Sequence, residues 1–177
     1  MISDMPWVCG GCSSEWGFSE GSQPFGIYRP VVMEVTDSIR IEPFGVHVWN
    51  DEKAETVCIE TEVKNYGDTA EPIEIISTFK DKRNQTVFRL ASEITLEAGQ
   101  VKIVKQSATL DNPHFWSVDD PYLYAVNSSI IHKNKRIDKV VTPFGIRTVS
   151  WPVIRKDGDH RFLLNGKACL LYTSDAA

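Results

Sequence analysis

The sequence predicts an all-β fold, because apolar residues recur at every second position and almost nowhere with the spacing of a helix. The alternation is clearest in residues 56–64, where Val57, Ile59 and Val63 point to one face and charged residues point to the other. Clusters of Gly, Asn and Asp separate such runs at intervals of roughly 8–12 residues. This spacing is typical of a sandwich of antiparallel strands.

Seven strands are predicted between residues 38 and 150. The first covers 39–49 and is interrupted at Pro43, because a proline cannot donate to the ladder of hydrogen bonds and favours a bulge. The sequence lacks the Cys…Trp…Cys pattern of antibody domains, so we expect an immunoglobulin-like β-sandwich of another type. The other six strands are predicted at 56–64, 72–80, 86–90, 101–110, 121–131 and 137–142.

The two ends of the chain differ from this sandwich. Residues 1–26 are rich in Gly, Ser and Trp, and a strong strand is predicted at 26–35. A single strand cannot bury its apolar side chains alone, so we expect its sheet to lie upstream and the segment to expose apolar surface. Near the other end, Asn165 and Gly166 form the dipeptide that favours the two-residue turn of a hairpin.

Composition argues against several classes of protein. The 177 residues carry a net charge of −5 and no cluster of Lys or Arg, so we expect no nucleic-acid partner. No apolar run reaches the length that spans a bilayer, so we expect no membrane association. The first residues also lack the basic and apolar regions of a signal peptide.

No metal or other cofactor is expected. Cys9 and Cys12 have the spacing of half a zinc site, but no second pair of ligands completes it, and idle or buried thiols are favoured. Asp157 and Asp159 form a turn without the further ligands of a calcium loop. The four histidines are scattered singly and are interpreted as surface or core residues: His47, His114, His132 and His160.

Four motifs occur in an order that resembles glycoside hydrolase family 2, the group of β-galactosidases, β-glucuronidases and β-mannosidases. They are FGIYRPV at 25–31, WSVDDPYLY at 116–124, FGIR at 144–147 and FLLNGK at 162–167. In that family a jelly-roll sugar-binding domain ends in a Gly-Ile-aromatic-Arg strand, and an immunoglobulin-like sandwich follows. An Asn-Gly-Lys hairpin then opens the catalytic (β/α)₈ barrel.

The resemblance implies an internal fragment that lacks the catalytic barrel. Residues 1–37 would be the C-terminal remnant of the jelly-roll domain, 38–150 the sandwich and 151–168 the start of the barrel. Residues 169–177 do not match the continuation of the family. They resemble the translation of a transposon-type sequencing adaptor, and we interpret them as a non-native tail.

The resemblance also implies a retaining reaction with two glutamates, both of them in the barrel. No catalytic residue is therefore assigned in this chain, and the fragment alone is expected to be inactive. Glu20 is the candidate for substrate binding, because several family members carry an aspartate at this position, six residues before Gly26, on a loop that reaches the sugar. A solvated loop carboxylate is the alternative interpretation of Glu20.

Several motif residues also have structural interpretations. Trp116 and Tyr124 are large enough to fill one end of a sandwich. Gly26 and Gly145 are expected where a side chain would clash with packed backbone. Arg147, like Arg29, is expected to bond backbone carbonyls or carboxylates at a domain junction.

A freestanding carbohydrate-binding or adhesion module built on the same sandwich is the alternative to an enzyme fragment. Such a module should begin and end at the edges of the sandwich, whereas this sequence extends beyond both edges, which favours the fragment. The partner expected in the full-length enzyme is a carbohydrate substrate, and a homo-oligomer is compatible with the sequence. A bacterial cytoplasmic or periplasmic location is favoured.

Overall fold

A computed structural model describes residues 30–151 and 162–168 of the chain. The chain divides into two units, Met1–Val35 and Thr36–Ala177. Residues 30–35 are the described part of the first unit, and they form no strand. The strand predicted at 26–35 is therefore wrong over these residues, since such a segment becomes a strand only where a sheet offers it hydrogen bonds. Its apolar side chains are exposed, as expected: Val31, Val32, Met33 and Val35.

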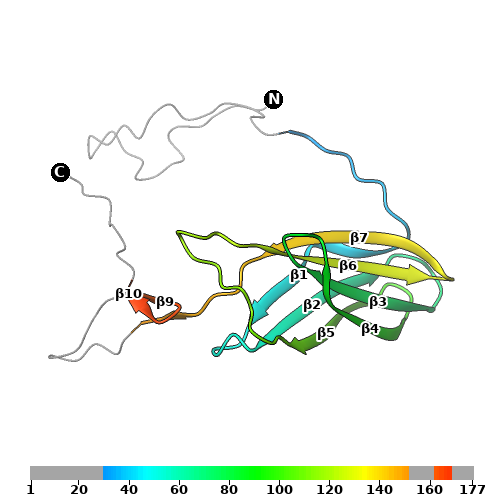
Figure 1. Cartoon of the computed structure of the whole chain (residues 1–177). Coiled ribbons are helices and arrows are strands. Elements are labelled where there is room, and N and C mark those ends of the chain that lie inside the picture. The colour runs from blue at the N-terminus through cyan, green and yellow to red at the C-terminus, as the bar shows by residue number, and fades with distance from the viewer. Residues whose placement is uncertain (1–29, 152–161, 169–177) are drawn as a thin grey trace, which may run out of the picture. The chain divides into compact units, whose positions relative to one another are not determined.

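Seven strands of the second unit form two antiparallel sheets that pack face to face (Figure 1). One sheet has the order β1-β2-β5 and the other β4-β3-β6-β7, which confirms the predicted immunoglobulin-like sandwich. The fourth strand extends six residues beyond the predicted end at Leu90, to Leu96. The strands are β1 (Ile39–Asn50), β2 (Thr56–Asn65), β3 (Glu71–Lys80), β4 (Thr86–Leu96), β5 (Val101–Thr109), β6 (Tyr124–His132) and β7 (Lys135–Phe144).

The bulge predicted at Pro43 is present in β1. The pairing of β1 with β2 shifts register between Ile41 and Val46. Phe44 has a φ of 60° and a fully exposed side chain. A Cβ at Gly45 would lie 2.7 Å from the carbonyl oxygen of Glu42, so only glycine fits beside the bulge.

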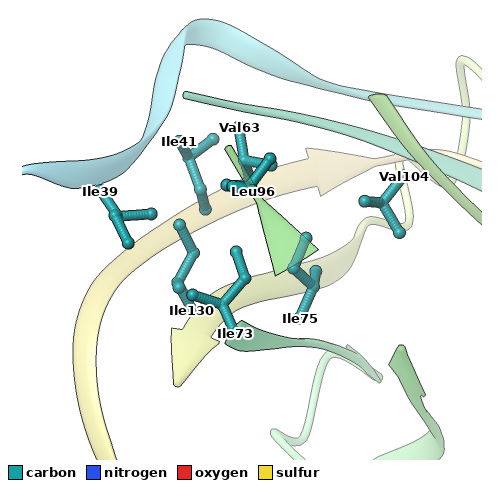
Figure 2. Close-up of a cluster of buried hydrophobic side chains, with 8 residues drawn as sticks. All are labelled: Ile39, Ile41, Val63, Ile73, Ile75, Leu96, Val104 and Ile130. Carbon is teal, nitrogen blue, oxygen red and sulfur yellow. The ribbon is translucent and has the colours of Figure 1, made fainter. Parts of the chain in front are cut away.

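The sandwich core contains two groups of buried apolar side chains. Figure 2 shows the first, in which side chains from the two sheets point towards each other. We call it the aliphatic cluster; it consists of Ile39, Ile41, Val63, Ile73, Ile75, Leu96, Val104 and Ile130. The second group is the aromatic cluster, which consists of Ala54, Val57, Ile59, Phe79, Leu110, Tyr124, Val126 and Ile146.

A layer of buried polar side chains separates the two clusters along the strands. Thr61, for example, lies on β2 between Ile59 of the aromatic cluster and Val63 of the aliphatic cluster. The polar layer consists of Thr61, Ser77, Gln106 and Ser128. The Nε2 atom of Gln106 donates to Ser92 Oγ at 2.9 Å and thereby joins the two sheets, since β5 and β4 belong to different ones. The hydroxyls of Thr61, Ser77 and Ser128 have no hydrogen-bond partner among the described residues.

The edge of β1 is close to β7 of the other sheet. There the backbone N–H of Ile41 donates to the Asp138 carboxylate, with 2.7 Å between the nitrogen and Oδ2. A side chain of one sheet thus satisfies a backbone donor at the edge of the other, which closes this side of the sandwich.

Candidate functional site

The aromatic cluster lies at the end of the sandwich where the chain leaves β7. Tyr124 is buried there, with its ring stacked on Phe79 at a centroid distance of 4.7 Å. Its hydroxyl accepts a hydrogen bond from the backbone N–H of His114 at 2.9 Å, and burial raises the pKa of that hydroxyl. This confirms the prediction that Tyr124 fills one end of the sandwich.

Trp116 does not fill the end of the sandwich as Tyr124 does. Its side chain is only half-buried and packs on the segment that follows β7. Its backbone N–H donates to the carbonyl of Ile146 at 2.8 Å. A Cβ at Gly145 would lie 2.9 Å from the Cβ and Cγ of Trp116. The predicted clash at Gly145 is confirmed, but the obstacle is the Trp116 side chain and not backbone. Gly26 lies outside the described residues.

Arg147 is held by groups other than those expected. Its guanidinium lies over the indole ring of Trp116, 5.1 Å from the ring centroid, in a cation–π contact. Its backbone carbonyl accepts from Asn50 Nδ2 at 3.0 Å, and its N–H donates to Asn50 Oδ1 at 3.3 Å. Among the described residues, the partner of the guanidinium is thus an aromatic ring in place of the expected carbonyl or carboxylate. Arg29 lies outside the described residues.

The predicted Asn-Gly hairpin is present. Its strands, β9 (Leu163–Leu164) and β10 (Lys167–Ala168), pair in antiparallel fashion. Asn165 and Gly166 have φ angles of 51° and 74°, both in the left-handed region that a type I′ turn requires. A third strand that the sequence did not suggest, β8 (Val149–Ser150), pairs with β9. We call β8, β9 and β10 together the hairpin sheet.

The hairpin sheet is joined to the sandwich by Asn165. Its Oδ1 accepts from the Thr148 N–H at 2.9 Å, and its own N–H donates to the Thr148 carbonyl at 2.9 Å. Its Nδ2 donates to the Trp116 carbonyl at 2.9 Å. The sequence indicated Asn165 as a turn residue alone and did not mark Asn50 or Thr148, because no local pattern signals these contacts.

A cavity of about 790 Å³ lies beside this junction, between the loop after β5 and the hairpin sheet. Its walls include Phe115, Asp119 and Asp120 on the sandwich side and residues 164–168 of the hairpin. Asp120 lies in the loop before β6, where its N–H donates to Ser117 Oγ at 3.1 Å. Its carboxylate Oδ2 lies 2.6 Å from Nε2 of His114. These contacts show that Asp120 holds the loop in shape.

Two further carboxylates of the described residues have structural partners as well. Glu60 pairs with Lys105, with 2.7 Å between the carboxylate oxygen and Nζ. Glu71 lies 2.9 Å from Nε2 of His132 and 3.3 Å from Nζ of Lys133, and these two partners, His132 first, lower the pKa of its carboxyl group. A carboxyl group with a lowered pKa stays ionised and is unsuited to act as a general acid.

His47 is exposed at the surface, and its ring centroid lies 4.8 Å from that of Trp49. In residues 30–151 and 162–168, no three His, Cys, Asp or Glu side chains gather as metal ligands. Nor does that part of the chain contain a helix able to cross a membrane. Several predicted residues lie outside the described part: Cys9, Cys12, Glu20, Asp157, Asp159 and His160.

Comparison with known proteins agrees with this fold. The family model for glycosyl hydrolases family 2 matches residues 39–147. A β-galactosidase of Bacteroides ovatus, BoGH2A, is 32% identical over 145 residues, which are 80% of this chain and 16% of the relative. A β-glucuronidase of Formosa agariphila is 28% identical over 158 residues, or 83% of this chain and 16% of the relative.

A solved structure shows the same architecture. It is that of a family 2 glycosyl hydrolase from Bacteroides cellulosilyticus, with a TM-score of 0.67 and 27% identity. The match covers 75% of this chain and 18% of the solved one. The chain thus spans about a sixth of the length of these known proteins. With a family model matching more than half of its residues and a relative above 30% identity, this chain belongs to the glycosyl hydrolases family 2.

Proposed function

We propose that this chain is the accessory region of a retaining glycoside hydrolase, which hydrolyses a β-linked galactoside or glucuronide when complete. The family match over residues 39–147 carries this proposal, and the names of the two curated relatives, a β-galactosidase and a β-glucuronidase, supply the substrate class. The substrate of the complete enzyme is accordingly a carbohydrate.

The proposed chemistry needs two carboxyl groups about 5 Å apart. One protonates the leaving glycosidic oxygen, and the other attacks the anomeric carbon to form a glycosyl-enzyme that water then hydrolyses. We assign both roles to glutamates of the barrel and none to this chain. The partners found for Glu60, Glu71 and Asp120 support that assignment, since each of these carboxylates serves a structural contact.

The contribution of this chain is a rigid connection between domains. A sandwich with its own buried core keeps its shape without help from neighbouring domains. The contacts of Trp116, Arg147 and Asn165 support a fixed exit from the sandwich towards the barrel.

The proposal is tested by comparing the purified 177-residue chain with the enzyme encoded by the uninterrupted source gene. Both are incubated with the nitrophenyl β-galactoside and β-glucuronide. We expect the complete enzyme to release nitrophenol from at least one substrate and the chain from neither. Turnover by the chain alone would contradict the assignment, as would a complete gene without the two glutamates. Sugar binding by the chain without turnover would instead favour a freestanding carbohydrate-binding module.

We propose further that Glu20 contacts the sugar in the complete enzyme, through a loop of the sugar-binding domain. Glu20→Ala should then raise the KM strongly, because a carboxylate that bonds sugar hydroxyls is lost. Glu15→Ala, five residues away in the same segment, is the matched control and should leave the KM unchanged. An unchanged KM for Glu20→Ala would identify Glu20 as a solvated loop carboxylate.

A further inference from the structure

The turn between β9 and β10 does not by itself require asparagine. Both turn positions have positive φ angles, 51° at Asn165 and 74° at Gly166. Asn, Asp and Gly are all favoured at the first position of such a turn. The choice of asparagine therefore needs a reason beyond the backbone conformation.

The side-chain amide of Asn165 uses one acceptor and one donor outside the hairpin. Oδ1 accepts from the Thr148 N–H, and Nδ2 donates to the Trp116 carbonyl, both at 2.9 Å. An ionised aspartate could accept the first bond but could not donate the second, and glycine could make neither. Of the three residues that suit the turn, only asparagine can make both contacts.

The bond to Trp116 reaches a well-anchored part of the sandwich. Trp116 is fixed by its N–H bond to Ile146, by close packing on Gly145 and by the guanidinium of Arg147. β8 follows β7 after only four residues, 145–148, of which Ile146 is buried and Arg147 is bonded through its backbone to Asn50. Rotation of the hairpin sheet is therefore left to the backbone dihedrals around Thr148. A side-chain bond across this connection removes that freedom.

The chain contains a second hairpin for comparison. The turn between β6 and β7 has φ angles of 49° at Lys133 and 63° at Asn134, so it has the same conformation as the Asn165 turn. The first position of that turn, which Asn165 occupies in the other hairpin, is taken by Lys133, whose Nζ lies 3.3 Å from Glu71 on β3 of the same sheet. Asn165 differs in that its amide bonds to Thr148 and Trp116, both of which lie outside the hairpin sheet.

We propose that Asn165 is a positioning residue, whose side chain fixes the orientation of the hairpin sheet relative to the sandwich. This orientation sets the direction in which the chain continues after Ala168. The effect on a catalytic barrel rests on the proposed function, whereas the orientation itself does not.

The test uses the isotopically labelled 177-residue chain and measures residual dipolar couplings, which report the relative orientation of its parts. In the unmodified chain, couplings from the sandwich and from the hairpin sheet should fit one common alignment tensor. Asn165→Gly keeps the turn but deletes both side-chain bonds, so the hairpin couplings should shrink and no longer fit that tensor. The Thr148 amide should also exchange with solvent faster, on the order of tenfold, because its acceptor is gone.

Two further variants complete the design. Lys133→Gly changes the equivalent first position of the β6–β7 turn and should leave the couplings of the hairpin sheet unchanged. Asn165→Asp keeps the acceptor for Thr148 but places a carboxylate beside the Trp116 carbonyl, so the orientation should change here too. If Asn165→Gly also loses the cross-strand contacts of the hairpin, Asn165→Asp decides the outcome, since Asp is favoured in this turn.

Hairpin couplings that still fit the common tensor in Asn165→Gly and Asn165→Asp would overturn the proposal. The free energy of unfolding of the sandwich should stay unchanged in both variants, which separates positioning from general destabilisation. An inactive complete enzyme would contradict the proposed function but would leave these couplings as expected. A failure of the proposed function can therefore be told apart from a failure of the positioning role.

Discussion

The sandwich and the hairpin sheet are held by different kinds of interaction. The sandwich buries two clusters of apolar side chains between seven strands. In the hairpin sheet each strand has two residues, and none of its described side chains is fully buried. In the described part of the chain, Asn165 bonds this sheet to the connecting residue Thr148 and to the Trp116 carbonyl of the sandwich. Burial thus stabilises the fold of the sandwich, whereas directional polar bonds orient the small sheet attached to it.

The largest effect is expected from loss of the central aromatic side chain of the sandwich. Phe79 is completely buried and stacks on Phe88 at 4.8 Å and on Tyr124 at 4.7 Å. Phe79→Ala should lower the free energy of unfolding by about 3–5 kcal/mol, as for other buried aromatic residues. Urea denaturation followed by circular dichroism measures the loss.

The matched control for Phe79→Ala is Phe44→Ala, because the Phe44 side chain is fully exposed on the bulge of β1. Its free energy of unfolding should stay close to that of the unmodified chain. Equal losses in the two variants would mean that the aromatic cluster does not stabilise the sandwich.

An intermediate effect is expected at the boundary between the two regions. Gly145→Ala places a methyl group 2.9 Å from Trp116 and should cost roughly 1–3 kcal/mol, because an overpacked site must shift its neighbours. Combining it with Trp116→Ala should cost less than the sum of the two single variants, since the short contacts with the Cγ and Cδ1 of Trp116 are then absent and only the contact with its Cβ remains. Denaturation of all four proteins gives the coupling, and strict additivity would contradict the packing described for this pair.

A smaller effect of opposite sign is expected in the polar layer. Thr61 is completely buried, and its hydroxyl has no partner among the described residues. Thr61→Val keeps the shape and should raise the free energy of unfolding by about 1 kcal/mol, because the desolvation cost of the hydroxyl disappears. Thr69→Val, at an exposed position outside the core, is the control. A loss of stability in Thr61→Val would show that the hydroxyl is bonded in the folded protein.

The smallest effect concerns pH. His132 and Lys133 lower the pKa of Glu71 in the folded chain below its ordinary value of 4.5. A lowered carboxyl pKa contributes stability that is present above 4.5 and is lost as the pH falls through the lowered value. Glu71→Gln should therefore flatten the pH dependence of the unfolding free energy below 4.5, and only weakly, since salt screens a pair at the surface. Glu55→Gln is the control, and an identical pH profile for both variants would rule out the contribution of Glu71.

The sequence predicted best what depends on local patterns. The alternation in 56–64 identified both the strand and its buried face, because neighbouring side chains of a strand must point to opposite sides. Pro43 and the Asn165-Gly166 pair indicated a bulge and a turn for the same reason, since their backbone preferences are intrinsic.

What the sequence could not predict depends on contacts between distant residues. Asn50 and Arg147 are 97 positions apart, and no local feature marks them as partners. Arg147 was expected to bind a carbonyl or a carboxylate, yet its guanidinium lies over Trp116, because cation–π contacts depend on three-dimensional placement. The strand predicted at 26–35 is absent over the described residues 30–35 for a related reason, since a strand depends on a sheet as well as on its own sequence.

The bond between Ile41 and Asp138 has a consequence for aggregation. Strand edges with free N–H groups can pair with strands of other molecules. Four exposed apolar residues also precede β1 in the sequence: Val31, Val32, Met33 and Val35. At this edge the Asp138 carboxylate already accepts a hydrogen bond from the Ile41 N–H. A strand from another molecule would have to displace a charged group to pair there, so this single aspartate acts as a gatekeeper against edge-to-edge association.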